Sequence, residues 1–252
     1  LFALPLLEEA STLTVTGRVE SAPYIAMTLD ALERFGVRVT IEEHRYRILP
    51  QTYRSPGKVR VEGDWSNAAF WLCAGALSGP VTVTGLDRNS LQGDRTVTEI
   101  LSQMGAAVSA EADRVTVSPG DLRAVDIDAA SIPDLVPILA VTAASLNGAT
   151  FTNISRLRLK ESDRVATVAE MLRRLGASAH VSENELIVCP AQFHGCTIDA
   201  HGDHRIAMSA AIAATVADGT ITILGAECVA KSYPSFWEDY KKLGGQYEQY
   251  IR

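Results

Sequence analysis

Apolar and polar residues alternate in four short stretches of this chain, and a segment with helical periodicity follows each of them. Alternation with period two indicates a strand with one buried face, whereas apolar residues three and four positions apart indicate an amphipathic helix. The predicted strands occupy residues 13–17, 81–85, 150–153 and 221–225. Each predicted helix ends just before a glycine, which adopts at least cost the left-handed conformation that closes a helix. These glycines are Gly36, Gly105, Gly176 and Gly244.

A second class of helix precedes three of those strands. The three segments are residues 64–76, 133–146 and 204–217. They are apolar on nearly every face, which is typical of helices buried in a core rather than lying at the surface. The repeating unit is therefore predicted to be βαβαββ, with one buried and one half-exposed helix. We predict an α/β (α+β) fold built from repeats of this unit.

The repeat plan also predicts how the chain divides. In the first repeat the buried helix would have to begin before Leu1, so residues 1–7 are interpreted as the tail of that helix. We therefore expect the chain to be the C-terminal portion of a longer protein. A turn-like segment at residues 55–58 marks a change of composition. The prediction is an incomplete last repeat of one domain in residues 1–57, and a second domain of three repeats in residues 58–252.

Composition narrows the classes of partner. The 252 residues carry a formal net charge of −7, which argues against nucleic acid as a general partner. No apolar run approaches the length of a membrane span, so no membrane partner is expected. The four cysteines form no CxxC pair, which favours reduced thiols and a cytoplasmic protein.

A zinc site is an alternative for a group of cysteines and histidines that lie within sixteen positions of one another. They are Cys189, His194, Cys196, His201 and His204. Their spacings match no standard pattern of zinc ligands. Cys189 also closes an apolar, strand-like run, where cysteine usually serves as a small hydrophobic residue. We therefore predict no metal.

The most charged segment of the chain lies between a predicted strand and a predicted helix. Six of the nine residues at positions 156–164 are charged: Arg156, Arg158, Lys160, Glu161, Asp163 and Arg164. The positive end of a helix dipole repels cations, so cations at this place favour an anion that is bound there by the dipole and the guanidinium groups together. The alternative is a solvated loop with salt bridges of its own.

Other predicted helices also begin with polar residues. Ser21 and Asp134 open two of them and are commonly simple caps. His204 and Arg205 open the most apolar helix, where a buried cation pair is costly without an anion. With Lys160, Arg164 and Lys231, these cations could bind one or two phosphates, and Glu161 and Asp134 could move protons beside them. The chain has neither a P-loop nor a GxGxxG motif, so nucleotide hydrolysis and dinucleotide binding are not supported.

Four motifs closely resemble those of the 5-enolpyruvylshikimate-3-phosphate (EPSP) synthase family, also called 3-phosphoshikimate 1-carboxyvinyltransferases. They are KESDR at 160–164, GDHRIAM at 202–208, AKSYPSF at 230–236 and GDWSNAA at 63–69. The resemblance implies an enolpyruvyl transferase-like fold of two domains, of which the first would be mostly absent from this chain. It implies transfer of the enolpyruvyl group of phosphoenolpyruvate to the 5-hydroxyl of shikimate 3-phosphate, with release of phosphate. It also implies that no cofactor is needed and that the full-length protein is a monomer.

The resemblance further implies roles for single residues. Asp134 would be the base for the substrate hydroxyl, and Glu161 and Lys231 would move protons at the enolpyruvyl carbon. Phosphoenolpyruvate would be bound by three cations with His204 nearby, namely Arg164, Arg205 and Lys231. The residues implied to contact shikimate 3-phosphate are Ser21, Tyr24 and Lys160. Arg156 stands where some family members place an asparagine that touches the same substrate.

Two alternatives remain at this point. UDP-N-acetylglucosamine enolpyruvyl transferase shares the implied fold but lacks the pairing of the KESDR and DHRIAM motifs. A repeat scaffold without catalysis is an alternative of a different class. Because the family's remaining substrate-binding residues would lie outside this chain, we expect the 252 residues alone to have negligible turnover.

Overall fold

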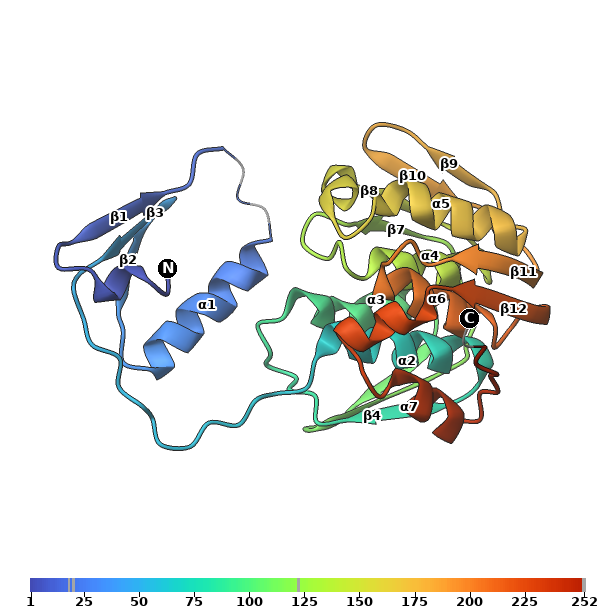
Figure 1. Cartoon of the computed structure of the whole chain (residues 1–252), viewed down its shortest axis with the longest axis horizontal. Helices are drawn as coiled ribbons and strands as arrows, with labels where there is room; N and C mark the ends of the chain where they lie inside the picture. Colours follow the sequence, from blue (N-terminus) through green and yellow to red (C-terminus); the bar gives the residue numbers. More distant parts are fainter. Residues whose placement is uncertain (18, 20, 122, 251–252) are drawn as a thin grey trace. The chain divides into compact units, whose positions relative to one another are not determined.

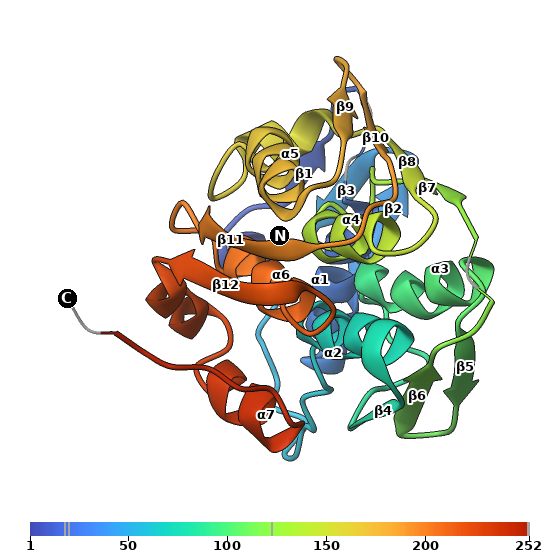
Figure 2. The ribbon, with the colours of Figure 1, turned by 90° about the vertical axis from the view of Figure 1, so that its right-hand side faces the viewer.

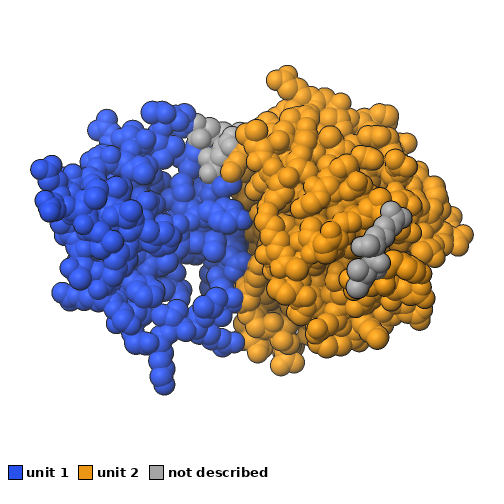
Figure 3. All heavy atoms as spheres, in the orientation of Figure 1, with its two compact units in different colours: residues 1–62, 89–93 blue, residues 63–88, 94–252 orange. Residues whose placement is uncertain are grey.

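The computed structural model describes residues 1–17, 19, 21–121 and 123–250 (Figure 1). It divides into two compact units, Leu1–Glu62 with Asn89–Gly93 and Gly63–Arg88 with Asp94–Arg252 (Figure 3). The division after Glu62 lies a few residues beyond the predicted boundary, within a stretch from 49 to 64 that forms neither helix nor strand. The assignment of 1–57 and 58–252 to two domains stays a prediction.

The first unit contains one complete amphipathic helix and a small antiparallel sheet. Its elements are η1 (Leu4–Leu6), β1 (Ser11–Thr14), α1 (Ala22–Arg34), β2 (Val39–Glu42) and β3 (Arg45–Ile48). The strand order is β1-β3-β2, and Leu32 of α1 is buried together with Ile48 of β3. Where the tail of a helix was expected at residues 1–7, the structure has only a short 3-10 turn. Pro5 lies in this turn, and a proline inside an α-helix would remove a hydrogen bond and clash with the preceding turn.

The second unit contains three repeats in chain order, except that residues 89–93 of the first repeat are grouped with the first unit. The first has α2 (Trp65–Ser78), β4 (Val81–Thr84), η2 (Gly93–Thr96), α3 (Val97–Gln103), β5 (Ala107–Ala110) and β6 (Arg114–Ser118). The next has β7 (Val125–Asp128), α4 (Val136–Ala144), β8 (Ala149–Thr152), η3 (Ser155–Leu159), α5 (Arg164–Leu175), β9 (Ala179–Val181) and β10 (Glu185–Val188). The last has β11 (His194–Asp199), α6 (His204–Ala213), β12 (Asp218–Leu224), η4 (Ala226–Lys231) and α7 (Phe236–Lys242).

Strand pairing confirms the predicted βαβαββ unit. The middle repeat is complete, with β7 parallel to β8 and both β8 and β9 antiparallel to β10. The last repeat pairs β11 with β12 in parallel, and the first forms the antiparallel sheet β4-β6-β5. The half-exposed helices end where predicted, because Gly36, Gly105, Gly176 and Gly244 all have positive φ angles. These glycines relieve the strain that a side chain would cause at a helix end.

The core of the second unit is built around the three apolar helices α2, α4 and α6, which contact one another (Figure 2). Every residue of α4 is buried, and in α6 only Arg205 is not. Gly75 lets α2 lie directly on β6, because a Cβ there would be 2.6 Å from the Val117 carbonyl oxygen. Burying these helices on all sides leaves their N-terminal turns as the places where polar side chains can gather.

Candidate active site

Acidic residues cap the N-termini of three helices in the second unit. Asp163 accepts hydrogen bonds from two backbone amides of α5, and Asp64 does the same for α2. Asp203 caps α6 by accepting a hydrogen bond from the backbone amide of Arg205 at 3.0 Å. Each cap satisfies amides that have no partner within the helix and places a negative charge at the positive end of the dipole.

Arg164, the first residue of α5, is the centre of the charged cluster. Its side chain has 0% exposure. Nε donates to Asp203 Oδ2 at 2.7 Å, Nη1 to Asp134 Oδ1 at 2.6 Å and Nη2 to Glu161 Oε2 at 2.6 Å. All three guanidinium nitrogens therefore donate to carboxylates of this chain. Arg164 links the turn before α4 to the N-termini of α5 and α6.

Asp134 lies in the turn just before α4 and not, as expected, in the first turn of that helix. The helix begins at Val136 and has Pro137 in its first turn, where a proline costs no hydrogen bond. Besides Arg164, the Asp134 carboxylate faces Lys160 Nζ at 3.1 Å and Arg205 Nη2 at 3.6 Å. Burial alone would raise the pKa of Asp134, but Arg205, Lys160 and Arg164 outweigh it and hold the pKa well below its usual range.

Glu161 lies between a buried cation and an exposed one. One carboxylate oxygen accepts from Arg164, and the other faces Lys231 Nζ at 3.3 Å. Its side chain is 29% exposed, whereas that of Lys231 is 57% exposed. Burial tends to raise the pKa of Glu161, but its own backbone amide and the charge of Arg164 lower it below the usual value. The carboxylate is ionised at neutral pH and reaches the edge of the cluster.

His204 and Arg205 at the N-terminus of α6 each have a buried nitrogen that finds no hydrogen-bond partner among the described residues. These atoms are Nδ1 of His204 and Nη1 of Arg205. A buried donor with no partner is costly, so the Arg205 guanidinium has capacity for an added anion. Burial, followed by the charge of Arg205, lowers the pKa of His204. The imidazole is therefore neutral at neutral pH and can act as a hydrogen-bonding group.

The remaining predicted site residues are Arg156, Ser21 and Tyr24. Arg156 is half-buried in η3, on the segment that leads to α5. Ser21 is the N-cap of α1 and has a positive φ of 52°. Tyr24 follows in the first turn of α1 with 50% of its surface exposed. Both belong to the first unit, so their contact with shikimate 3-phosphate stays a prediction.

Sequence reasoning missed two buried acids, Asp203 and Asp94. Besides capping α6, the Asp203 carboxylate accepts from Arg164 and from Ser162 Oγ at 3.0 Å. The signal was available, since Asp203 directly precedes the cation pair of the most apolar helix. Asp94 carries no comparable signal. It is 7% exposed, and its pKa is raised to about 6, chiefly by burial, with the charge of Asp134 adding to the rise.

Asp94 predicts a specific pH dependence of stability. A carboxyl whose pKa is raised in the folded state stabilises the protein below its ordinary pKa, and this contribution is lost as the pH rises through the folded value of about 6. Asparagine cannot ionise, so replacing Asp94 by asparagine removes this pH-dependent loss of stability. At about 1.4 kcal/mol per unit of pKa, we expect Asp94→Asn to be more stable than the native chain at pH 7 by up to roughly 3 kcal/mol, and nearly equal at pH 4.

Urea unfolding at pH 4, 5, 6 and 7 measures this difference. The matched control is Asp126→Asn, which changes an exposed carboxylate in β7. A difference between Asp94→Asn and the native chain that stays constant from pH 4 to pH 7 would contradict the prediction.

Among the described residues, no group of three or more His, Cys, Asp or Glu side chains is arranged to hold a metal ion. Of the residues weighed as zinc ligands, His201 instead faces Glu170 at 3.4 Å. Within the same described ranges, no helix is long and apolar enough to cross a membrane.

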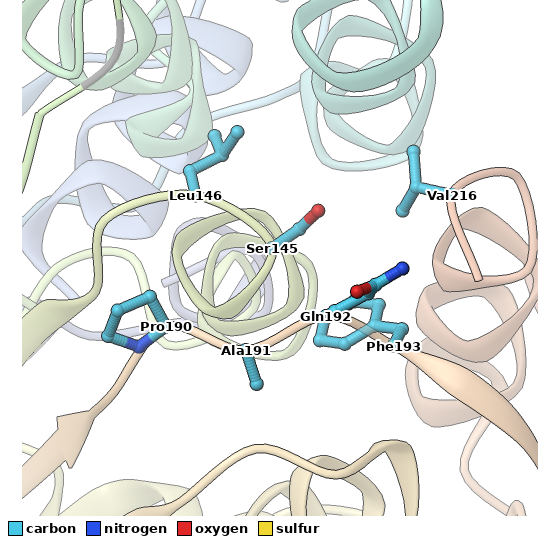
Figure 4. Close-up of a pocket in the computed structure, with 7 residues that line it drawn as sticks. All are labelled: Ser145, Leu146, Pro190, Ala191, Gln192, Phe193 and Val216. Atoms are coloured by element: carbon cyan, nitrogen blue, oxygen red, sulfur yellow. The ribbon is translucent and has the colours of Figure 1, made fainter. Parts of the chain in front are cut away.

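A separate open hollow of about 410 Å³ lies at the C-terminal end of α4 (Figure 4). It is lined by Ser145, Leu146, Pro190, Ala191, Gln192, Phe193 and Val216. Asp134 precedes the opposite end of the helix, so the charged cluster and this hollow are separated by the whole of α4. With no ionisable side chain in its lining, the hollow cannot supply acid–base chemistry.

Comparison with known proteins agrees with this architecture. The family model for EPSP synthase (3-phosphoshikimate 1-carboxyvinyltransferase) matches residues 1–240. A solved EPSP synthase from Acinetobacter baumannii superposes with a TM-score of 0.82 at 27% identity, over 97% of this chain and 59% of that chain. The enolpyruvyl transferase NikO from Streptomyces tendae has the same fold, with a TM-score of 0.76 at 24% identity over 96% of this chain and 57% of its own. The fold is thus that of the enolpyruvyl transferases.

Curated relatives narrow the class to one family. The 3-phosphoshikimate 1-carboxyvinyltransferase of Clostridium kluyveri is 41% identical over 254 residues, which cover 99% of this chain and 59% of the relative. That of Clostridium perfringens is 42% identical over 250 residues, covering 97% of this chain and 59% of the relative. The chain belongs to the EPSP synthase family. It spans about 59% of the length of these relatives.

Proposed function

We propose that this chain forms part of an enzyme that transfers the enolpyruvyl group of phosphoenolpyruvate to the 5-hydroxyl of shikimate 3-phosphate. The product leads to chorismate and the aromatic amino acids. The observation that carries the proposal is the cluster around Arg164, in which two acids besides the helix cap Asp203 and three further cations come together. These are Asp134, Glu161, Lys160, Arg205 and Lys231. Family membership supports the same reaction.

In the proposed reaction the substrate oxygen forms a bond with C2 of phosphoenolpyruvate, and the bond from C2 to the phosphate oxygen later breaks. A proton is added to C3 in the first step and removed in the second. Lys231 and Glu161 face each other at 3.3 Å, so an ammonium donor and a carboxylate acceptor are available at one place for these two transfers. The unpartnered nitrogen of Arg205 and the exposed ammonium of Lys231 are the proposed anion contacts.

Arg164 and Asp134 have less direct roles in this proposal. The buried guanidinium of Arg164 is occupied by three carboxylates, so in this proposal it mainly holds Glu161 and Asp134 in place, and it would contact phosphoenolpyruvate only if one of these bonds were released. Asp134 would accept the hydroxyl proton of shikimate 3-phosphate. Its low pKa makes it a weak base while Arg205 faces it, and an anion that draws Arg205 away would increase its basicity.

The remaining assignments follow the family. Lys160, together with Arg156, Ser21 and Tyr24, is proposed to contact shikimate 3-phosphate, and neutral His204 to donate a hydrogen bond near phosphoenolpyruvate. The proposed steps use acids, bases and fixed charges of the chain, so we propose that no metal or organic cofactor takes part. We also propose a cytoplasmic enzyme that is monomeric at full length.

The test compares the 252-residue chain with a chimera. In the chimera, the part of the Clostridium kluyveri relative that this chain does not match is joined to it. We expect phosphate release from phosphoenolpyruvate and shikimate 3-phosphate by the chimera, and negligible release by the chain alone, because closure over both substrates needs the complete enzyme. Circular dichroism and a cooperative melting transition establish that the chimera is folded.

Each alternative predicts a different result. Release that requires UDP-N-acetylglucosamine as acceptor would identify the sugar-nucleotide enzyme instead. If a folded chimera released no phosphate with either acceptor, the scaffold alternative would remain, and the proposed function would be contradicted. Substantial release by the 252-residue chain alone would contradict the proposal that it is only part of the enzyme.

A further inference from the structure

Lys231 is the most exposed member of the charged cluster, and little in its own side chain fixes where it lies. It ends η4, and its ammonium faces Glu161 Oε1 at 3.3 Å. A lysine side chain has four rotatable carbon–carbon bonds, so an exposed ion pair of this kind does little to fix the position of the ammonium. The placement of the backbone that carries Lys231 therefore decides whether the ammonium reaches Glu161.

Two side chains of α2 bind the residues that directly follow Lys231. Asn67 Nδ2 donates to the Ser232 carbonyl oxygen at 3.2 Å, and Trp71 Nε1 donates to Tyr233 Oη at 3.0 Å. Asn67 and Trp71 are four residues apart, so they lie on one face of the helix. Together the two bonds hold consecutive residues of one segment against one turn of α2.

Both donors are themselves fixed in place. Asn67 Nδ2 also donates to Asp64 Oδ2, the N-cap of α2, at 2.9 Å. The Trp71 ring stacks on the fully buried ring of Phe236, with 4.9 Å between centroids. Tyr233 packs edge-on against Phe236 and donates its hydroxyl proton to Asp239 Oδ2 at 2.9 Å. A donor locked by packing and by a second bond loses little entropy when it holds its acceptor.

We propose that Asn67 and Trp71, the α2 clamp, position Lys231 against Glu161 by holding the Ser232–Tyr233 segment. They are positioning residues, because neither touches Glu161 or the Lys231 side chain in the structure. The consequence for catalysis rests on the proposed function, whereas the placement of Lys231 does not. The apolar pattern of α2 does not predict this positioning role, because in the sequence both residues look like ordinary members of a buried helix.

The first experiment measures the placement without any substrate. A short pulse of acetic anhydride acetylates unprotonated amines, and peptide mass spectrometry compares Lys231 with the exposed Lys58 as an internal reference. Because the contact with Glu161 at 3.3 Å shields the Lys231 amine from the reagent, we expect Glu161→Gln to raise the relative reactivity of Lys231 about two- to fivefold, as an exposed ion pair allows. The double variant Asn67→Ala/Trp71→Phe should raise it as much, although it leaves Glu161 intact.

A double-mutant cycle identifies the cause. If the clamp acts through the ion pair, adding Glu161→Gln to the clamp variant should raise the reactivity no further. The matched control is Asn184→Ala/Trp237→Phe, which changes an exposed asparagine and a tryptophan that packs edge-on against Phe236 and is not one of the two donors to the Ser232–Tyr233 segment. It should leave Lys231 at the native reactivity.

Two results overturn the inference. One is native reactivity of Lys231 in the clamp variant, and the other is an effect of the clamp that adds fully to that of Glu161→Gln. In the chimera, the clamp variant is expected to lower the rate of phosphate release about tenfold. Lys231→Ala should lower this rate far less in the clamp variant than it does in the chimera with the clamp intact. An inactive chimera with a positive acetylation result would contradict the proposed function and leave the placement of Lys231 established.

Discussion

Replacing Arg164 by methionine is expected to lower the free energy of unfolding of the second unit by about 3–5 kcal/mol, the range for removing one partner of a buried ion pair. Arg164 has no exposed side-chain surface, and it donates hydrogen bonds to three carboxylates at 2.6–2.7 Å. Methionine fills a similar volume but leaves Asp134, Glu161 and Asp203 close together without their shared cation. Urea unfolding followed by tryptophan fluorescence reports this unit, because Trp65, Trp71 and Trp237 all belong to it.

The pH dependence of this loss gives a second check. Asp134, Glu161 and Asp203 all have lowered pKa values in the folded chain, although burial opposes the effect. Their contribution to stability is present above the ordinary carboxyl pKa of about 4 and is lost as the pH falls below it. The difference between Arg164→Met and the native chain should therefore shrink in acid.

The control for Arg164→Met is Arg174→Met on the same helix. Arg174 is 60% exposed and faces Glu170 at 3.6 Å, so its removal should change the free energy of unfolding by no more than about 0.5 kcal/mol. Equal effects of the two substitutions at neutral pH would show that the buried cluster does not stabilise the unit.

Replacing Glu161 by glutamine in the chimera is expected to lower the rate of phosphate release by roughly two to four orders of magnitude, the usual contribution of a positioned acid–base group. Glutamine keeps the size of the side chain but cannot take up a proton from the enolpyruvyl carbon. Arg164 keeps Asp134 and Asp203 as partners, so the fold should survive. The steady-state rates and the melting temperature of the variant measure the two effects separately.

Glu170→Gln is the matched control, since Glu170 lies on the exposed face of α5 and should leave the rate unchanged. A scaffold would be indifferent to both substitutions. Equal activity of Glu161→Gln and the native chimera would remove Glu161 from the proposed mechanism, and the acetylation experiment on Lys231 would be unaffected by that result.

Local patterns predicted most of the secondary structure. The helix from Arg164 to Leu175 begins after the charged segment and ends at Gly176, as the spacing of its apolar residues indicated. The buried helices α2 and α6 also begin where predicted, after Asp64 and Asp203. The exception is α4, which begins at Val136 rather than at residue 133, because the residues before Pro137 form a turn that carries Asp134.

Apart from Asp203, the sequence singled out the members of the charged cluster, but it did not predict which of them pair. Cations at the front of α5 suggested an external anion, yet Arg164 is neutralised by Asp134 and Asp203, which are 30 and 39 positions away in the sequence. No local pattern records which residues of separate repeats will meet. The capacity for an external anion lies instead with Arg205, whose Nη1 has no partner, and with the exposed Lys231.

By itself, the order of the residues determined the repeat, where most helices begin and the family, because periodicity, helix-closing glycines and contiguous motifs are properties of neighbouring positions. Only the tertiary structure decided which acid faces which cation, how deeply Asp94 and Arg164 are buried, and that α2 holds the segment next to Lys231. Those properties depend on distances between residues from different repeats, and they arise only when the apolar helices pack together and bring their N-terminal turns to one place.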